Sequence, residues 1–266
     1  MIITLLTDYG PHDEFVGVCH GVIRTIEPDA SIIDITHGIS RHDIRHGAIS
    51  LRNAIPYMPV GVHVAIVDPQ VGTERRGVAV RCEDGRVLVG PDNGLLALAW
   101  ERAGGIAEAI DITRSPHRLE PISATFHGRD VFVPVAAQLA AGAELRDAGE
   151  PLPVEELVTL DLPKPLISPG SATVHALLID GYGNVSLDLS HDDLIDLEMT
   201  LGGRVEVGGP RLSAEATLVQ TFADVAPGEM LVYEDAWGAI AVAVNRGDAA
   251  KALGVHRDAE LRVTRR

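Results

Sequence analysis

The chain has 266 residues, 46% hydrophobic and 23% charged, which is enough for one large globular domain or two modest ones. Its formal net charge of −16 opposes attraction to nucleic acid or to an anionic membrane, so neither is expected as a partner. The first residues lack signal-peptide features, no apolar stretch has the length of a membrane span, and Cys19 and Cys82 have no metal-binding spacing. We therefore expect a cytoplasmic protein with two small, buried thiols.

The first part of the chain alternates between strand-like and helix-like patterns. The hydrophobic periodicity predicts strands at residues 2–6, 31–35, 62–67, 77–81, 87–90 and 106–112, and helices at 14–26, 44–55, 94–102 and 130–141. This alternation predicts a layered α/β domain with a mostly parallel sheet, to which we assign residues 1–160. No G-x-G-x-x-G motif follows the first strand, which argues against an NAD-dependent enzyme.

The second part of the chain has the pattern of a small all-β domain. Proline and glycine between residues 161 and 171 indicate a linker. Beyond it, short alternating runs separated by turn signals occur at 173–179, 184–189, 204–207, 216–222, 230–233 and 239–244. They predict a barrel or sandwich over residues 172–266, with one short helix at 248–253.

Polar loops adjoin the predicted strands and helices of the first domain. Asp8, Asp68 and Asn93 each follow a strand, and His127 precedes a helix. Because ligands in open α/β sheets bind beyond the carboxyl ends of the strands, the loops are expected to form one site. Singly, each residue has a structural explanation, as a turn former, a helix cap or a surface histidine. The site is indicated by the four loops together.

Five segments occur in order along the chain: Thr7-Asp8-Tyr9-Gly10 with Asp13, Asp68-Pro69 with Val71-Gly72-Thr73-Glu74-Arg75-Arg76, Pro91-Asp92-Asn93-Gly94-Leu95-Leu96, Thr125-Phe126-His127-Gly128-Arg129-Asp130, and Asp180-Gly181-Tyr182-Gly183-Asn184-Val185. Together they resemble the signatures of the S-adenosyl-L-methionine (SAM) hydroxide adenosyltransferases, relatives of the bacterial fluorinase and chlorinase. The resemblance extends from Ile3 to about Gly254. It implies an N-terminal α/β domain, a C-terminal β domain, and a homotrimer with substrate bound between subunits.

The resemblance also implies a reaction, the hydrolysis of SAM to adenosine and methionine by in-line (SN2) attack of activated water at the ribose C5′. Hydrolytic members carry an Asp-Arg-His set that Asp68, Arg75 and His127 match, whereas halogenating members lack it. A fixed guanidinium would stabilise developing hydroxide, and Asp68 would orient Arg75. No cofactor and no metal are implied.

The resemblance places substrate contacts in both predicted domains. Asp8 would accept the ribose hydroxyls, and Asn93 belongs to the substrate-binding set. The remaining implied contacts are a stack of Tyr182 on adenine, an edge contact from Asn184, an ion pair of Asp180 with the methionine ammonium, and a Trp237 loop whose backbone holds the carboxylate. Three positions depart from the family pattern: Gln70, where hydrolases usually have glycine, His42, where fluorinase has tryptophan, and Ala236, which lacks a hydroxyl.

Two other interpretations remain open from the sequence. A metal-dependent hydrolase would use Asp8, Asp68, Asn93 and His127 as ligands, with His42 and His46 as an added pair one helical turn apart. Arg75 beside a cation would be repulsive, which argues against it. A nucleoside-binding sensor without turnover would not need the complete Asp68, Arg75 and His127 set.

Overall fold

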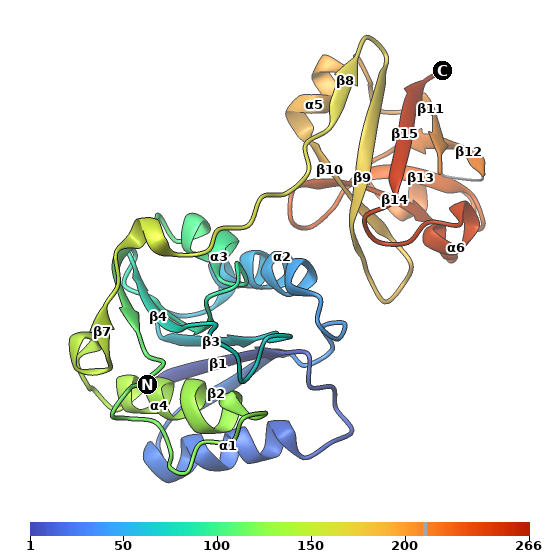
Figure 1. The fold of residues 1–266 in the computed structure, drawn as a ribbon. Coiled ribbons are helices and arrows are strands. Elements are labelled where there is room, and N and C mark those ends of the chain that lie inside the picture. The colour runs from blue at the N-terminus through green and yellow to red at the C-terminus, as the bar shows by residue number, and fades with distance from the viewer. Residues whose placement is uncertain (210–211) are drawn as a thin grey trace. The chain divides into compact units, whose positions relative to one another are not determined.

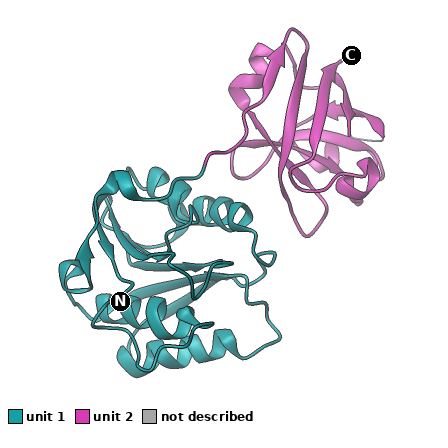
Figure 2. Cartoon of the chain, viewed as in Figure 1, with its two compact units in different colours: residues 1–160 teal, residues 161–266 magenta. Residues whose placement is uncertain are grey.

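A computed structural model describes residues 1–209 and 212–266 of the chain. Two compact units, Met1–Leu160 and Asp161–Arg266, divide the chain between them (Figure 2). Each unit has its own hydrophobic core, and each is described by itself.

The first unit alternates strands with helices. Its strands and longer helices are β1 (Ile2–Thr7), α1 (Phe15–Ile26), β2 (Ser31–Thr36), α2 (Ile44–Ala54), β3 (Val62–Ile66), β4 (Gly77–Cys82), β5 (Val87–Pro91), α3 (Ala97–Arg102), β6 (Ile106–Asp111), α4 (Val133–Ala140) and β7 (Glu150–Pro151). Short helical turns are η1 (Ile55–Tyr57), the π-helical turn η2 (Gly128–Phe132), η3 (Leu145–Asp147) and η4 (Val154–Glu156).

These strands form one sheet in the order β2-β1-β3-β5-β4-β6-β7. The neighbours β2, β1, β3 and β5 run parallel, and the pairs from β5 through β4 and β6 to β7 are antiparallel. Helices α1 and α4 pack on one face of the sheet, and α2 and α3 on the other (Figure 1). β1 and β3 are almost wholly buried because helices cover both faces of the sheet.

The second unit is a closed β-barrel with one added strand. Its elements are β8 (Leu166–Ser168), β9 (Ser171–Ile179), β10 (Val185–Ser190), α5 (His191–Asp196), β11 (Arg204–Gly208), β12 (Ser213–Leu218), η5 (Phe222–Asp224), β13 (Met230–Glu234), β14 (Ala239–Val244), α6 (Ala249–Leu253) and β15 (Glu260–Arg265). The ring runs β10-β14-β13-β12-β11-β15-β9 and closes by pairing β9 with β10, while β8 extends β9 at the edge. Alternate side chains of these strands fill the interior.

The predicted fold class, an α/β domain followed by a small all-β domain, is confirmed. Cys19 and Cys82 are free and buried, as expected, and burial raises the pKa of each thiol to about 12. The sequence analysis did not identify β15, the strand that pairs with both β11 and β9 in the barrel. Within the described residues, no helix is long and apolar enough to cross a membrane.

Candidate active site

The carboxyl ends of β1 and β3 lie side by side and open into a pocket of about 290 Å³. Parallel pairing aligns Thr7 with Ile66, and the N–H of Asp8 donates to the carbonyl of Ile66 at 3.3 Å. Asp8 and Asp68 therefore emerge next to each other at one edge of the sheet. The pocket is lined by Asp8, Tyr9, Asp13, Phe15, Arg41, His42, Ile66, Asp68, Val71, Thr125, His127 and Gly128.

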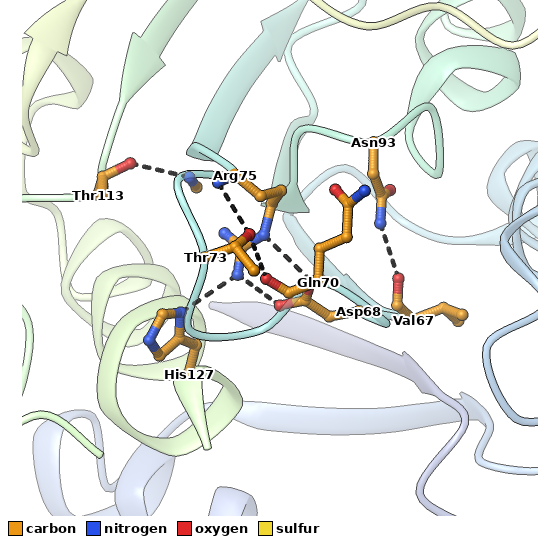
Figure 3. Close-up of polar contacts among 9 residues, drawn as sticks. Val67, Asp68, Gln70, Thr73, Arg75, Asn93, Thr113 and His127 are labelled. Atoms are coloured by element: carbon orange, nitrogen blue, oxygen red, sulfur yellow. Dashed lines mark hydrogen bonds and ion pairs between the residues drawn. The ribbon is translucent and has the colours of Figure 1, made fainter. Parts of the chain in front are cut away.

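The guanidinium of Arg75 donates two hydrogen bonds to the carboxylate of Asp68 (Figure 3). Its Nε lies 3.1 Å from Oδ1 of Asp68 and its Nη2 lies 2.5 Å from Oδ2. Both side chains are nearly buried, with 4% and 6% of their surfaces exposed, and the guanidinium also lies over the ring of Phe132. A bidentate pair with so little solvent contact fixes the guanidinium plane.

The same guanidinium reaches His127, which stands just before η2. Nη2 of Arg75 lies 3.2 Å from Nδ1 of His127 (Figure 3). A guanidinium has only donors, so Nδ1 must accept, and the proton of the neutral imidazole lies on Nε2. Burial and the charge of Arg75 lower the pKa of His127, which keeps the imidazole neutral at neutral pH.

Two glycines let the loops of this site approach each other closely. Gly72 has a φ of +78°, and a Cβ added to it would collide with the carbonyl oxygen of Ala124. Likewise, a Cβ on Gly128 would collide with the hydroxyl of Tyr9. Only glycine permits this packing, which holds the Asp68–Arg75 loop against the segment that carries His127.

Asp8 has a structural bond as well as a place in the pocket. Its Oδ2 accepts the backbone N–H of His42 at 2.9 Å. His42 has a φ of +65°, the left-handed conformation, which turns its N–H toward the carboxylate. Among the described residues Oδ1 of Asp8 accepts no such bond, and Asp8 is one of the residues that line the pocket.

Asn93 forms hydrogen bonds that connect two loops next to the site. Its amide N–H donates to the carbonyl of Val67 at 2.9 Å, and its side-chain oxygen accepts the N–H of Leu95 at 3.1 Å (Figure 3). These bonds, of which Figure 3 shows the one to Val67, join the end of β3 to the turn after β5. Asn93 is not one of the described residues that line the pocket.

The other predicted site residues lie on the second unit and form a loop cluster there. Asp180 accepts the N–H groups of Tyr182 and Asn184 at Oδ1, at 2.8 and 2.9 Å, and the side-chain amide of Asn184 at Oδ2. This ordered turn leaves the Tyr182 side chain 82% exposed.

Trp237 lies on a second loop of this unit, between β13 and β14. Its backbone N–H donates to Oδ1 of Asp235 at 2.8 Å, and the hydroxyl of Ser186 on β10 donates to Oδ2 of the same carboxylate. The Trp237 side chain is 49% exposed. Asp235 thus orders the loop whose backbone the resemblance assigns to the methionine carboxylate. The sequence analysis did not consider Asp235.

The structure shows a cluster of aromatic side chains at the pocket that the sequence analysis did not identify. Tyr9, Phe15 and Phe126 form a cluster with ring centroids 5.0 to 5.8 Å apart, and the first two line the pocket. Burial raises the pKa of Tyr9 well above its usual value, so its hydroxyl stays protonated. The position of Tyr9 directly after Asp8 was the available signal.

The metal-hydrolase interpretation is not favoured by this arrangement. Asp68 is occupied by Arg75, and the pair of His42 and His46 does not share a helix turn, because α2 begins at Ile44. Among the described residues, the one group of three His, Cys, Asp or Glu side chains close enough to share an ion is His20, Asp34 and His37. None of these belongs to the ligand set that this interpretation requires.

Comparison with known protein families gives two matches that follow the two units. Residues 3–149 match the SAM hydroxide adenosyltransferase N-terminal domain, and residues 174–262 match the C-terminal domain of the same family. The two matched segments cover most of the chain.

Individual relatives match along nearly the whole length. A protein of Salinispora tropica named (R)-S-adenosyl-L-methionine hydrolase is 47% identical over 264 residues, covering 98% of this chain and 97% of the relative. A protein of the same name from Thermus thermophilus is 37% identical, covering 98% of each chain. The solved structure of an uncharacterised conserved protein of Thermotoga maritima superposes with a TM-score of 0.92 at 34% identity, covering 100% of both chains.

Proposed function

Since the chain belongs to the SAM hydroxide adenosyltransferase family, we propose that it hydrolyses SAM to adenosine and L-methionine by in-line attack of water at the ribose C5′. The observation that carries this proposal is the shared guanidinium of Arg75, which bonds both Asp68 and His127 in the wall of the pocket. No cofactor is required, because the sulfonium of SAM is already an activated leaving group.

The chemical difficulty of this reaction lies in the nucleophile. Neutral water is a poor nucleophile, and a buried, fixed cation favours the developing hydroxide. Arg75 supplies that cation, and the bidentate bond to Asp68 prevents it from turning away. Attack of hydroxide on a sulfonium removes two charges, which a pocket with little water favours.

We assign His127 the role of a hydrogen-bond donor to the attacking oxygen. Its Nδ1 lone pair is engaged by Arg75, so the neutral ring offers N–H at Nε2. In this arrangement a proton acceptor at Nδ1 would have to break the bond to Arg75. Two donors of this kind stabilise hydroxide, and the proton lost by water passes to solvent.

The substrate contacts are proposed on the same geometry. Asp8 accepts the ribose hydroxyls, mainly through Oδ1, because Oδ2 already accepts the N–H of His42. At about 290 Å³ the pocket is at the lower end of the range for small-molecule sites, so we expect further contacts to come from other elements.

Those contacts are proposed to come from the second unit of a neighbouring subunit in a homotrimer. The exposed ring of Tyr182 would stack on adenine, and Asn184 retains a carbonyl oxygen and one N–H for its edge. Asp180 would contact the methionine ammonium, and the Trp237 loop its carboxylate. Light scattering at micromolar concentration tests this assembly, and a monomer there would contradict it.

Water is proposed as the nucleophile in preference to a halide. The chain carries the complete Asp68, Arg75 and His127 set, which the resemblance assigns to the hydrolytic members of the family and not to the halogenating ones (Figure 3). We place the enzyme in the cytoplasm, where free thiols such as Cys19 and Cys82 persist.

The decisive experiment is turnover of SAM in ¹⁸O-labelled water with added chloride or fluoride. Adenosine carrying the label in its 5′-hydroxyl, together with unlabelled methionine, is expected. Label elsewhere, or halogenated adenosine as the main product, would contradict the mechanism. Binding of SAM without any product would favour the sensor interpretation.

A further inference from the structure

His20, Asp34 and His37 converge beside the end of β1, outside the pocket lining described above. Nε2 of His20 lies 2.9 Å from Oδ1 of Asp34, and Nε2 of His37 lies 3.1 Å from the same oxygen. One ligand atom of each side chain lies within 4.8 Å of the others. We propose that these three residues bind one divalent transition-metal ion of the Zn²⁺ class.

An irregularity in the sheet brings two of the three side chains together. Residues three apart on a regular strand point to opposite faces of the sheet, which would separate Asp34 from His37. The register of β1 against β2 shifts at this point, with Leu5 opposite Asp34 and Leu6 opposite Thr36. The extra residue, Ile35, lets Asp34 and His37 meet on one side, where His20 of α1 reaches them.

The distances and donor types fit such an ion. Two ligand atoms bound tetrahedrally at about 2.0–2.1 Å from Zn²⁺ are separated by roughly 3.3 Å, close to the observed contacts to Oδ1 of Asp34. Two imidazoles and one carboxylate favour a first-row transition ion over Mg²⁺ or Ca²⁺, which prefer oxygen ligands. Three ligands leave a fourth position for water, and the 38% exposed Asp34 gives the ion a path of entry.

The environment of His37 supports this role. Its side chain is 14% exposed, and among the described residues its buried Nε2 has no hydrogen-bond partner of acceptable geometry. Its Nδ1 contacts the hydroxyl of Thr7 at 2.9 Å, and that hydroxyl also accepts the N–H of Tyr9. The hydroxyl can accept a hydrogen bond from the N–H at Nδ1, which leaves the lone pair of Nε2 free to bind the metal.

Bound there, the ion would join α1 and β2 to the end of β1, next to the loop that begins with Asp8. The carbonyl of His37 also accepts the N–H of Gly10 at 2.8 Å, so His37 holds this loop from two sides. The ion would therefore stabilise the folded first unit and is no part of the hydrolytic step. Its binding can be measured without SAM, independently of the proposed activity.

The test uses the full chain without a histidine tag, stripped with a chelator and dialysed. Zn²⁺ is titrated by calorimetry with metal analysis, and Co²⁺ by its visible absorption. We expect one ion per chain, a Co²⁺ spectrum of low coordination number, and a melting temperature that rises with Zn²⁺. His20→Gln and Asp34→Asn, which preserve size, should each weaken binding on the order of 100-fold.

His191→Gln is the matched control, because His191 pairs with Glu234 at 3.0 Å on the second unit and, among the described residues, belongs to no group of three possible ligands. Its binding of Zn²⁺ and Co²⁺ should equal that of the unchanged chain. If the unchanged chain binds no more tightly than the folded His20→Gln and Asp34→Asn variants, the three residues form only a hydrogen-bonded group and the proposal is wrong. Circular dichroism verifies that the variants fold.

Discussion

The guanidinium of Arg75 donates a hydrogen bond to Nδ1 of His127 across 3.2 Å. Because the guanidinium of Arg75 cannot accept a hydrogen bond, this contact fixes the tautomer of the neutral histidine and leaves its N–H at Nε2. A lowered pKa, caused by burial and by Arg75, keeps the ring neutral. The contact distinguishes two mechanisms. In one, His127 donates a hydrogen bond to the attacking oxygen, and in the other it removes a proton from the attacking water.

Replacement of His127 by glutamine and by alanine distinguishes these mechanisms. Glutamine keeps an N–H donor but cannot take a proton near neutral pH, whereas alanine has neither property. If His127 donates, His127→Ala should lower kcat on the order of 100-fold and His127→Gln considerably less, with KM little changed in both. Adenosine release followed by chromatography gives both constants. Equal losses in the two variants would assign His127 to proton transfer instead.

Arg75→Lys should lower kcat on the order of 100-fold while KM changes little. Lysine keeps the charge, but its single ammonium cannot hold the carboxylate of Asp68 and the ring of His127 in the present geometry. Arg76→Lys is the control, because the neighbouring Arg76 pairs with Asp92 and Glu156, whereas Arg75 pairs with Asp68 and His127. A loss of the same size in Arg76→Lys would show that general ion pairing, not the nucleophile, is affected.

Asp8→Ala should weaken SAM binding by roughly 2–4 kcal/mol, through the loss of charge-assisted hydrogen bonds to the ribose. Asp8→Asn keeps an acceptor for the N–H of His42 but removes the charge, so it should lie between alanine and the unchanged chain. Calorimetric titration on the slow Arg75→Lys background measures affinity with little turnover. Unchanged affinity in Asp8→Ala would mean that Asp8 serves only the loop around His42.

Gly72→Ala should reduce both stability and kcat, because the added methyl group collides with the carbonyl of Ala124 and separates the two catalytic loops. Gly202→Ala is a matched control: its φ of +82° is close to the +78° of Gly72, but a Cβ there meets open space. Both variants carry the backbone strain of about 1 kcal/mol, and only Gly72→Ala adds the collision. Similar melting temperatures and activities for the two would show that the loops adjust without cost.

The positions of the site loops could be predicted because they follow from local pattern. The apolar runs before Asp8 and Asp68 indicate buried strands, and the rule for open α/β sheets then places both residues at one edge. The contact of Arg75 with His127, 52 residues apart in the chain, is set by loop packing at Gly72 and Gly128, which no periodicity reports.

Other features depend on backbone geometry that the residue types do not reveal. His42 adopts a left-handed conformation to bond Asp8, although glycine is the usual residue there. β15 has three charged residues among its six, so its alternation was not recognised, yet Leu261 and Val263 complete the barrel core. The extra residue at Ile35, which brings Asp34 to His37, is visible only in the pairing of β1 with β2.

His63 makes the stability of the first unit depend on pH. It lies fully buried in β3, bonded to the hydroxyl of Thr4 at 3.0 Å, and burial lowers its pKa from 6.5 to about 4. Between these values the unfolded chain binds the proton and the folded chain does not, so the free energy of unfolding falls as pH drops from 6.5 to 4. The shift in pKa corresponds to a loss of at most roughly 3 kcal/mol in the free energy of unfolding, and this loss is complete below pH 4. In His63→Val this contribution disappears, so the free energy of unfolding of the unchanged chain minus that of His63→Val, measured in urea, should fall steadily from pH 7 to pH 4. His256→Gln, a change at an exposed histidine of the second unit, should leave the slope of the unchanged chain. Parallel curves for the unchanged chain and His63→Val would show that the buried imidazole does not carry the acid sensitivity.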